Sequence, residues 1–229
     1  NNKLLFGSEI KAILAHHDYK AGMDKEALLE YFTFQNFFTA KTLFQNVKML
    51  PSGHWMKIKL GQTDIPSPVR FWDYSFKEPE KARDEQEYIE ELDRLFRQAV
   101  NRQLVSDVDV GSYLSGGMDS GSITAVAATQ LPYIKTFTGG FDLHSASGLE
   151  LGFDEREQSE LMSYKFKTEH YEMVLKAGDM ERVLSKLTWH LEEPRVGQSY
   201  PNFYIAQLAS KFVKVVLAGT GGDELFGGY

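Results

Sequence analysis

The stretch that decides the fold is Leu114-Ser115-Gly116-Gly117-Met118-Asp119-Ser120. It follows an apolar run at residues 108–114 and leads into a helix-like run at residues 120–130, which predicts a strand, a tight glycine turn and a helix N-terminus. The free backbone N–H groups and the dipole of a helix N-terminus attract anions, and two glycines let the backbone approach a phosphate closely. The stretch therefore predicts an anion site at the end of a strand.

The polar side chains of this stretch indicate which kind of anion it binds. Ser115 and Ser120 can donate hydrogen bonds to phosphate oxygens, whereas Asp119 suits a site in which Mg²⁺ lies between its carboxylate and the phosphates. The sequence holds no G-x-x-x-x-G-K-[ST] motif, so a Walker-type loop is excluded. An ordinary strand-to-helix turn is the plain alternative, but the strand, both serines and the aspartate together favour a nucleotide site.

Composition places the chain among soluble globular proteins. Of its 229 residues 42% are hydrophobic, and no apolar run is long enough to span a membrane. The net charge of −7 and the scattered basic residues disfavour a nucleic-acid partner. The absence of cysteine excludes thiolate chemistry within these residues, and we expect a cytoplasmic protein without a signal or membrane segment. The first residue is Asn1, which favours a piece of a longer protein.

The first third of the chain has a mixed pattern. A short helix is predicted from Asp24, its N-cap, to Phe34, and four of its residues are expected to face inward: Ala27, Leu28, Tyr31 and Phe32. A Pro-Ser-Gly turn then leads into a strand that opens at Trp55 or Met56. Residues 61–85 contain three prolines and a charged stretch, which is the composition of a linker.

The rest of the chain alternates between helices and strands. After an amphipathic helix at about residues 84–105, strands are predicted near residues 108–114, 133–141, 169–175 and 212–218. The helices between them are predicted near residues 120–130, 154–167, 179–190 and 199–210. This alternation implies right-handed crossovers and a doubly wound parallel sheet in an α/β protein. Such sheets bind ligands beyond the carboxyl ends of their strands.

A second glycine turn, AGTGGDE at residues 218–224, follows the last predicted strand. A dinucleotide fingerprint is a weak alternative, because the position of its third glycine holds Glu224. Since both turns end strands of one sheet, we expect Asp119 and Asp223 to share a Mg²⁺ ion held by phosphates. Glu192 has two open interpretations, which are contact with the substrate and charge at a helix terminus.

Several stretches resemble known families. SGGMDS (residues 115–120) is similar to the signature of the N-type ATP pyrophosphatases, which cleave ATP between the α and β phosphates. AGTGGDELFGGY (residues 218–229) resembles the second signature of the glutamine-hydrolysing asparagine synthetases. The stretches KTFTGGF, TEHYE and HLEEP resemble segments between those two signatures. FGSEIKAIL, LFQNVKMLPSGHW and RFWDYS resemble the end of the glutaminase domain of that family and its link to the synthetase domain.

The resemblance implies a division of the chain and a reaction. Residues 1–60 would be the C-terminal part of a glutaminase domain, residues 61–85 a linker, and residues 86–229 the N-terminal part of a synthetase domain with the fold of the N-type ATP pyrophosphatases, the adenine nucleotide alpha hydrolase-like fold. The reaction would be the adenylation of a carboxylate, normally aspartate, followed by transfer of glutamine-derived ammonia. Its products would be asparagine, AMP and pyrophosphate, and the family resemblance leaves a homodimer open.

The resemblance also implies roles for individual residues. Contacts with adenosine or ribose would come from Leu114, Gly139, Ala218 and Gly219. The phosphates would be held by Ser115, Gly116, Gly117 and Ser120. Mg²⁺ would be bound by Asp119 and Asp223. The positions assigned to catalysis would be Asp119, Asp223, Thr220 and Glu192.

Thr220 departs from the family pattern. Family members that make asparagine commonly carry an acid at this position, where it is linked to forming or using the adenylate. The neutral hydroxyl of Thr220 leaves two alternatives open. One is a relative that uses the same adenylation for another acceptor, such as a β-lactam synthetase or a peptide macrolactam cyclase, and the other is a non-catalytic nucleotide-binding module.

Overall fold

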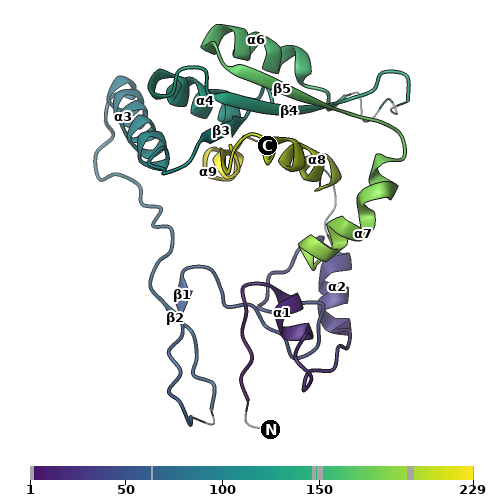
Figure 1. Cartoon of the computed structure of the whole chain (residues 1–229). Coiled ribbons are helices and arrows are strands. Elements are labelled where there is room, and N and C mark those ends of the chain that lie inside the picture. Colours follow the sequence, from purple (N-terminus) through teal and green to yellow (C-terminus); the bar gives the residue numbers. More distant parts are fainter. Residues whose placement is uncertain (1–2, 63, 146–147, 149–151, 195–198, 229) are drawn as a thin grey trace. The chain divides into compact units, whose positions relative to one another are not determined.

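The computed structural model describes residues 3–62, 64–145, 148, 152–194 and 199–228, and it divides into two compact units (Figure 1). Unit 1 comprises Asn1–Glu80 and Thr188–Gly197, and unit 2 comprises Lys81–Leu187 and Gln198–Tyr229. In the described part of the chain, no helix has the length and apolar character needed to cross a membrane.

Unit 2 is built on a four-stranded parallel sheet. Its strands are β3 (Val110–Tyr113), β4 (Lys135–Phe141), β5 (Glu169–Leu175) and β6 (Val215–Leu217), in the order β5-β4-β3-β6. The chain moves outward from β3 through β4 to β5, and it then returns to the other side of β3 with β6. The direction of winding reverses between β3 and β6, and the carboxyl ends of those strands are the expected place for a ligand.

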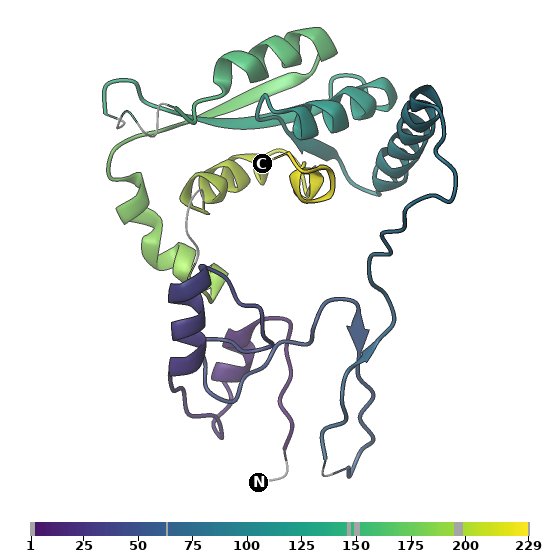
Figure 2. The same cartoon turned by 180° about the vertical axis from the view of Figure 1, so that it is seen from behind.

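Helices cover both faces of this sheet (Figure 2). The helices α4 (Met118–Gln130) and α6 (Arg156–Phe166) pack on one face, and α8 (Ser199–Ala209) packs on the other. The remaining helices are α3 (Glu85–Gln103), which packs on α4, α9 (Gly222–Phe226), and α7 (Asp179–Leu191), which runs from unit 2 into unit 1. Two neighbouring residues of β4 show the layering, because successive residues of a strand face opposite sides. A Cβ at Gly139 would lie 2.7 Å from Ile205 of α8, whereas one at Gly140 would lie 2.1 Å from the Arg156 Nε of α6.

Each face has its own apolar core. On one face Val100, Val126, Ala127 and Ile134 pack together, and on the other Phe137 packs with Ala209 and Val213. A buried polar contact also joins β3 to α4, since the hydroxyls of Ser112 and Thr124 lie 2.9 Å apart and neither residue is exposed. This contact satisfies both hydroxyls inside the core and fixes α4 against the strand that precedes it.

The predicted α/β class and doubly wound parallel sheet are confirmed, and every strand and helix predicted for residues 84–217 is present. The last strand is shorter than predicted, because it begins at Val215 rather than at residue 212. The N–H groups of Phe212 and Val213 both donate to the carbonyl of Ala209 at the end of α8. They therefore belong to the turn that closes this helix.

Unit 1 is smaller and contains α1 (Ile10–Leu14), α2 (Lys25–Phe34), β1 (His54–Trp55) and β2 (Val69–Arg70). The predicted N-cap is confirmed, since the carboxylate of Asp24 accepts from the N–H groups of Glu26 and Ala27. The inward orientation predicted for Phe32 is wrong, because this side chain is 73% exposed. Ala27 is the buried residue of α2, and Phe32 lies about 140° around the helix from it.

The first predicted strand also differs from expectation. It spans only His54–Trp55 and pairs in antiparallel fashion with Val69–Arg70. The segment predicted as a linker thus contributes a strand to unit 1, even though Val69 and Arg70 lie among prolines. This strand has only two residues, which is too short to give a periodic pattern in the sequence. Without such a pattern, the composition of the segment indicated a linker.

Candidate functional site

Hydrogen bonds between residues that are close in the sequence stabilise the glycine turn after β3. Gly116 has φ +86°, a conformation that favours glycine, and Gly117 is the extended N-cap of α4. The Ser120 hydroxyl accepts from the Ser115 N–H at 3.1 Å and lies 3.0 Å from the Ser115 hydroxyl. The Ser115 hydroxyl in turn accepts from the Gly117 N–H at 3.3 Å. Both predicted phosphate-binding hydroxyls therefore lie together at the N-terminus of a thirteen-residue helix.

The second glycine turn lies against the first. A Cβ at Gly219 would lie 2.9 Å from the backbone nitrogen of Ser120, and one at Gly222 would lie 2.4 Å from Cγ of Asp119. The two stretches are far apart in the sequence, but β6 pairs with β3 and brings their carboxyl ends together. The absence of side chains at Gly219 and Gly222 is what allows the second turn to reach the first turn of α4.

The carboxylates of Asp119 and Asp223 have no hydrogen-bond or ion-pair partner among the described residues. Asp119 lies in the first turn of α4 and Asp223 in the first turn of α9. Carboxylate oxygens without partners, beside two hydroxyls at a helix N-terminus, are suitable donors for a hard divalent cation. The Asp223 carboxylate is turned toward the end of the chain, because a Cβ at Gly228 would lie 2.1 Å from its Oδ1. The predicted sharing of one ion by both carboxylates therefore stays a prediction.

The residues predicted to contact adenosine differ in accessibility. Ala218 and Thr220 are exposed, and Gly219 is half-buried between the two turns. Leu114 has no exposed surface, so a direct contact with a ligand would require a neighbouring group to move. Gly139 lies beneath Ile205 of α8, at the contact described above. Ala218 and Gly219 are thus the predicted adenosine contacts that the structure brings beside Asp119.

Glu192 lies in unit 1, whereas both glycine turns lie in unit 2. Its carboxylate accepts from the backbone N–H groups of Ile10 at 2.6 Å and Lys11 at 2.7 Å, and it pairs with Lys11 Nζ at 3.0 Å. Ile10 and Lys11 begin α1, so the carboxylate satisfies donors that the start of a helix leaves free. These contacts favour the interpretation of Glu192 as helix-terminus charge, and its catalytic role stays a prediction.

The contacts of Glu192 predict a pH dependence. Burial alone would raise the pKa of this carboxyl, but the N–H groups of Lys11 and Ile10 and the Lys11 ammonium lower the pKa below its ordinary value of 4.5. Such a group stabilises the fold above its unfolded pKa, and the contribution is lost as the pH falls through the folded pKa. Glu192→Gln should therefore lower the free energy of unfolding at neutral pH but not in strong acid. Urea unfolding of both proteins at several pH values tests this, and a difference independent of pH would contradict it.

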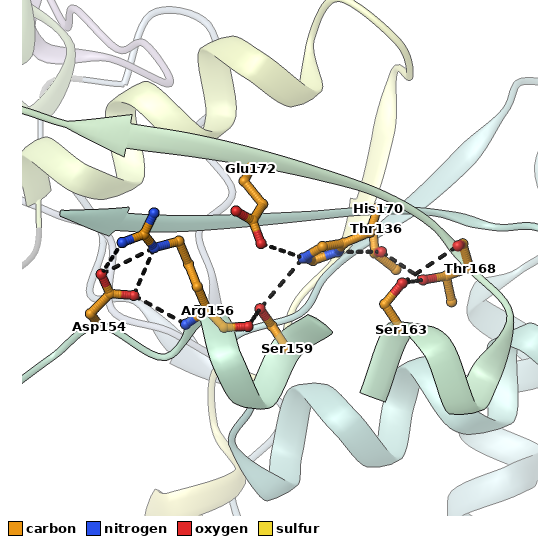
Figure 3. A network of polar contacts seen from close by, with 8 residues as sticks. All are labelled: Thr136, Asp154, Arg156, Ser159, Ser163, Thr168, His170 and Glu172. Carbon is orange, nitrogen blue, oxygen red and sulfur yellow. Dashed lines mark hydrogen bonds and ion pairs between the residues drawn. The ribbon is translucent and has the colours of Figure 1, made fainter. Parts of the chain in front are cut away.

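A polar network that sequence reasoning missed lies between α6, β4 and β5 (Figure 3). Arg156 donates to both oxygens of Asp154, at 2.9 and 2.7 Å, and also to the carbonyl of Phe141 at 3.0 Å. The N–H of Phe141 donates back to Asp154 at 3.0 Å. These four contacts join the start of α6 to the end of β4.

His170 continues the same network along α6. Its Nδ1 lies 2.8 Å from the Thr136 hydroxyl, while Nε2 lies 3.4 Å from the Ser159 hydroxyl and 3.6 Å from the carboxylate of Glu172. Burial lowers the pKa of His170, so the ring is held neutral at neutral pH. Burial and the nearby charge of Glu160 raise the pKa of Glu172. The network therefore fixes the position of α6 on the sheet through the Asp154–Arg156 ion pair at one end and through neutral hydrogen bonds around His170 at the other.

The first turn of α6 reaches the phosphate-binding turn. A Cβ at Gly116 would lie 2.7 Å from Cβ of Gln158 and 3.2 Å from the carbonyl oxygen of Glu155. Desolvation raises the pKa of Glu155, and the influence of the Ser115 hydroxyl opposes this rise. The acidic pair Asp154-Glu155, at the start of the helix predicted near residues 154–167, is the sequence signal that could have indicated this contact. The sequence leaves two interpretations open for the preceding loop at residues 142–152, a cover for a bound ligand and an ordinary surface loop. Residues 146–147 and 149–151 of this loop lie outside the described residues.

The Asp154–Arg156 pair predicts a measurable effect on stability. Its side chains are only 12% and 23% exposed, so Arg156→Ala would leave the carboxylate of Asp154 poorly compensated. We expect a loss of about 1–3 kcal/mol in the free energy of unfolding, measured by urea denaturation. Arg97→Ala is the matched control, because the Arg97–Asp93 pair is more than half exposed on both sides and should contribute nothing measurable. Equal losses in the two variants would contradict the prediction.

The chain is similar to known proteins along its whole length. Residues 91–229 match the family model described as asparagine synthase, and residues 1–72 match the one described as glutamine amidotransferase domain. A putative asparagine synthetase (glutamine-hydrolyzing) 2 of Methanocaldococcus jannaschii is 33% identical over the whole chain, which spans 43% of that relative. Asparagine synthetase (glutamine-hydrolyzing) 1 of Bacillus subtilis is also 33% identical over the whole chain, which spans 34% of it.

The chain therefore spans less than half the length of these curated relatives. Among solved structures, the NMN synthetase from Francisella tularensis is similar over 65% of this chain and 59% of its own, with 13% identity and a TM-score of 0.39. The match to the asparagine synthase model covers more than half of the residues, including both glycine turns. On this ground the chain belongs to the asparagine synthase family.

Proposed function

We propose that the protein is an ATP-dependent ligase that adenylates a carboxylate, with aspartate as the first candidate, and transfers glutamine-derived ammonia to it. A carboxylate oxygen would attack the α-phosphorus of ATP and release pyrophosphate. Ammonia would then attack the acyl carbon and release AMP, which leaves the amide. Membership in the asparagine synthase family and the names of the relatives support this proposal.

One observation supports it best, which is the meeting of the two glycine turns at the carboxyl ends of β3 and β6. The hydroxyls of Ser115 and Ser120, together with the N-terminus of α4, offer donors to the phosphates of ATP. Ala218 and Gly219, on the facing turn, are placed to contact its adenosine. Catalysis would come from holding the α-phosphorus in position and from stabilising the charge that develops on the leaving pyrophosphate.

The residues at this edge also fit a magnesium ion. Asp119 and Asp223 would hold it with oxygen ligands that have no other partner among the described residues. When bound, Mg²⁺ would supply positive charge that offsets the negative charge of the leaving pyrophosphate. Without such a cation, the two carboxylates would repel the phosphates that Ser115 and Ser120 attract.

Glutamine would be the source of the ammonia. Residues 1–72 match the glutamine amidotransferase model, and all of them belong to unit 1. We assign residues 1–60 to the C-terminal part of a glutaminase domain, residues 61–85 to the connection, and residues 86–229 to the synthetase domain. A cytoplasmic location and a homodimer are part of the same proposal, and cell fractionation and light scattering would test them.

Thr220 favours a second candidate for the carboxylate that is adenylated. It is exposed on the turn beside Gly219, where asparagine-forming relatives commonly carry an acid. A neutral hydroxyl is less suited to recognise the amino group of aspartate or to assist proton transfer during amide formation. The same adenylation could then serve another carboxylate, as in a β-lactam synthetase or macrolactam cyclase.

The decisive experiment is carboxylate-dependent ATP–pyrophosphate exchange by the full-length protein with Mg²⁺. Exchange that requires aspartate, followed by asparagine formation on addition of glutamine, would support the proposal. Exchange with another carboxylate alone would support the second acceptor. Binding of ATP without exchange under any carboxylate would overturn both and indicate a nucleotide-binding module.

A further inference from the structure

A chain of hydrogen bonds on one side of His170 fixes which of its ring nitrogens carries the proton (Figure 3). The Thr168 hydroxyl donates to Ser163 Oγ at 2.8 Å, so the 2.8 Å contact between the Thr168 and Thr136 hydroxyls uses the proton of Thr136. Thr136 has no second proton, and its oxygen therefore accepts from Nδ1 of His170 at 2.8 Å. The neutral ring thus carries its proton on Nδ1 and a lone pair on Nε2.

Among the described residues, no side chain offers a proton to this lone pair. Ser159 Oγ lies 3.4 Å from Nε2, but it donates to the carbonyl of Arg156 at 2.9 Å. Glu172 Oε1 lies 3.6 Å from Nε2, and this oxygen is buried without a hydrogen-bond partner in the described part of the chain. An ionised Glu172 would therefore leave two acceptors facing each other, which is costly because the side chains of His170 and Glu172 are only 11% and 26% exposed. One additional proton would satisfy both acceptors.

Ser159 connects this site to the glycine turn at residues 114–120. It has no exposed surface, and its N–H donates to the carbonyl of Glu155 at 3.0 Å. A Cβ at Gly116 would lie 3.3 Å from the Ser159 nitrogen and 3.2 Å from that carbonyl oxygen. The position of Ser159 relative to His170 therefore determines how the first turn of α6 packs on Gly116.

The surroundings of the pair favour the proton on Glu172 rather than on His170. The charged side chains that face the pair come from α6 and the segment before it, and they are Asp154, Arg156 and Glu160. From β4 the facing group is the Thr136 hydroxyl, which carries no charge. Burial raises the pKa of Glu172, Glu160 raises it further, and Arg156 opposes this rise. Burial lowers the pKa of His170, and Glu160 opposes this fall.

We propose that Glu172 binds the missing proton and donates it to Nε2 of His170, and that this hydrogen bond holds the first turn of α6 where it supports the glycine turn. His170 and Glu172 are positioning residues, because they act on the turn through Ser159. The part of the inference that concerns ATP rests on the proposed function. Loss of the proton leaves a carboxylate beside a lone pair, so the contact between β5 and α6 weakens.

Urea unfolding of the full-length protein at several pH values tests the proton. A carboxyl whose pKa is raised in the fold contributes stability that is complete below its ordinary pKa of 4.5 and is lost as the pH rises through the folded pKa. Glu172→Gln carries an N–H donor at every pH, so it should match the wild type in acid. Above the folded pKa, its unfolding constant should be at least about fivefold smaller than that of the wild type. Glu157→Gln is the matched control, because Glu157 is an exposed carboxylate in the first turn of α6, and it should follow the wild type.

Nitrogen NMR of the wild type observes His170 directly, even if Glu172→Gln fails to fold. We expect the neutral ring with its proton on Nδ1, and an Nε2 resonance that changes with pH while the ring stays neutral. This change should be absent in Glu172→Gln. A proton on Nε2 at every pH would overturn the inference, as would a difference in unfolding between Glu172→Gln and the wild type that does not depend on pH.

Calorimetry of Mg²⁺–ATP binding to the full-length protein tests the link to the glycine turn. Over the same pH range, the affinity of the wild type should fall by about fivefold as the pH rises, whereas Glu172→Gln should keep its affinity. A parallel fall in both proteins would overturn this link. A wild type that binds no ATP at any pH would refute the proposed nucleotide site and the link with it, and the unfolding and NMR results alone would then decide whether Glu172 holds the proton.

Discussion

Asp119→Asn is expected to slow ATP–pyrophosphate exchange by about 100-fold or more while leaving the protein folded. Asparagine preserves the size of the side chain, and Asp119 makes no hydrogen bond or ion pair in the described structure that the substitution would break. What is lost is the negative charge at the N-terminus of α4, beside the hydroxyls of Ser115 and Ser120. If this charge holds Mg²⁺ at the phosphates, the leaving pyrophosphate loses its main stabilisation.

The exchange rate should be measured over a range of Mg²⁺ concentrations, together with a urea unfolding curve. A partial recovery at high Mg²⁺ would agree with weakened metal binding. Asp107→Asn is the control, since Asp107 is an exposed carboxylate of the same unit, outside both glycine turns. Full exchange activity in Asp119→Asn would show that the proposed role of this carboxylate is wrong.

Gly222→Ala is expected to reduce exchange about as strongly as Asp119→Asn, although it removes no functional group. The new Cβ would lie 2.4–2.7 Å from all three terminal atoms of the Asp119 side chain, so the carboxylate must move. The φ of Gly222 lies outside the positive range that favours glycine, so the added methyl group costs little in backbone strain. A lower exchange rate in this variant would therefore show that the two glycine turns are in contact.

A matched substitution distinguishes this effect from a general cost of replacing glycine. Gly148→Ala meets nothing within 4 Å and should be silent. Combining Gly222→Ala with Asp119→Ala should restore the stability lost in Gly222→Ala, because the clashing carboxylate is then absent. Exchange at the wild-type rate in Gly222→Ala would show that the two turns do not meet in solution as they do here.

The sequence predicted the parallel sheet of unit 2 because its local hydrophobic patterns agree with the fold. The apolar runs that became β3, β4, β5 and β6 are bounded by glycine turns and separated by helical periodicity, so their order along the chain implied the parallel sheet. The sequence also implied that both signature turns end strands of one sheet, and the pairing of β6 with β3 in the structure places these turns side by side. The fold class and the position of both glycine turns at the carboxyl ends of strands of one sheet were therefore accessible without coordinates.

What the sequence did not reveal depends on contacts between distant segments. The approach of the first turn of α6 to Gly116, and the anchoring of α6 by Arg156, join parts of the chain that share no periodic pattern. The orientation of Asp223 toward Gly228 depends on the turn that ends α9. Likewise, the sequence left two interpretations of Glu192 open, and only its contacts with the start of α1 favour helix-terminus charge.

The strand order has a consequence for how the protein is made. Val110 of β3 and Val215 of β6 are paired in the sheet but lie more than a hundred residues apart in the chain. During synthesis the SGGMDS turn leaves the ribosome long before the turn that completes it, at a rate of about 5–20 residues per second. A nascent chain that ends before residue 217 would contain β3, β4 and β5 but would lack the edge beside β3. Nucleotide should therefore be unable to assist the early folding of this unit, and its binding should begin only after the last strand has docked.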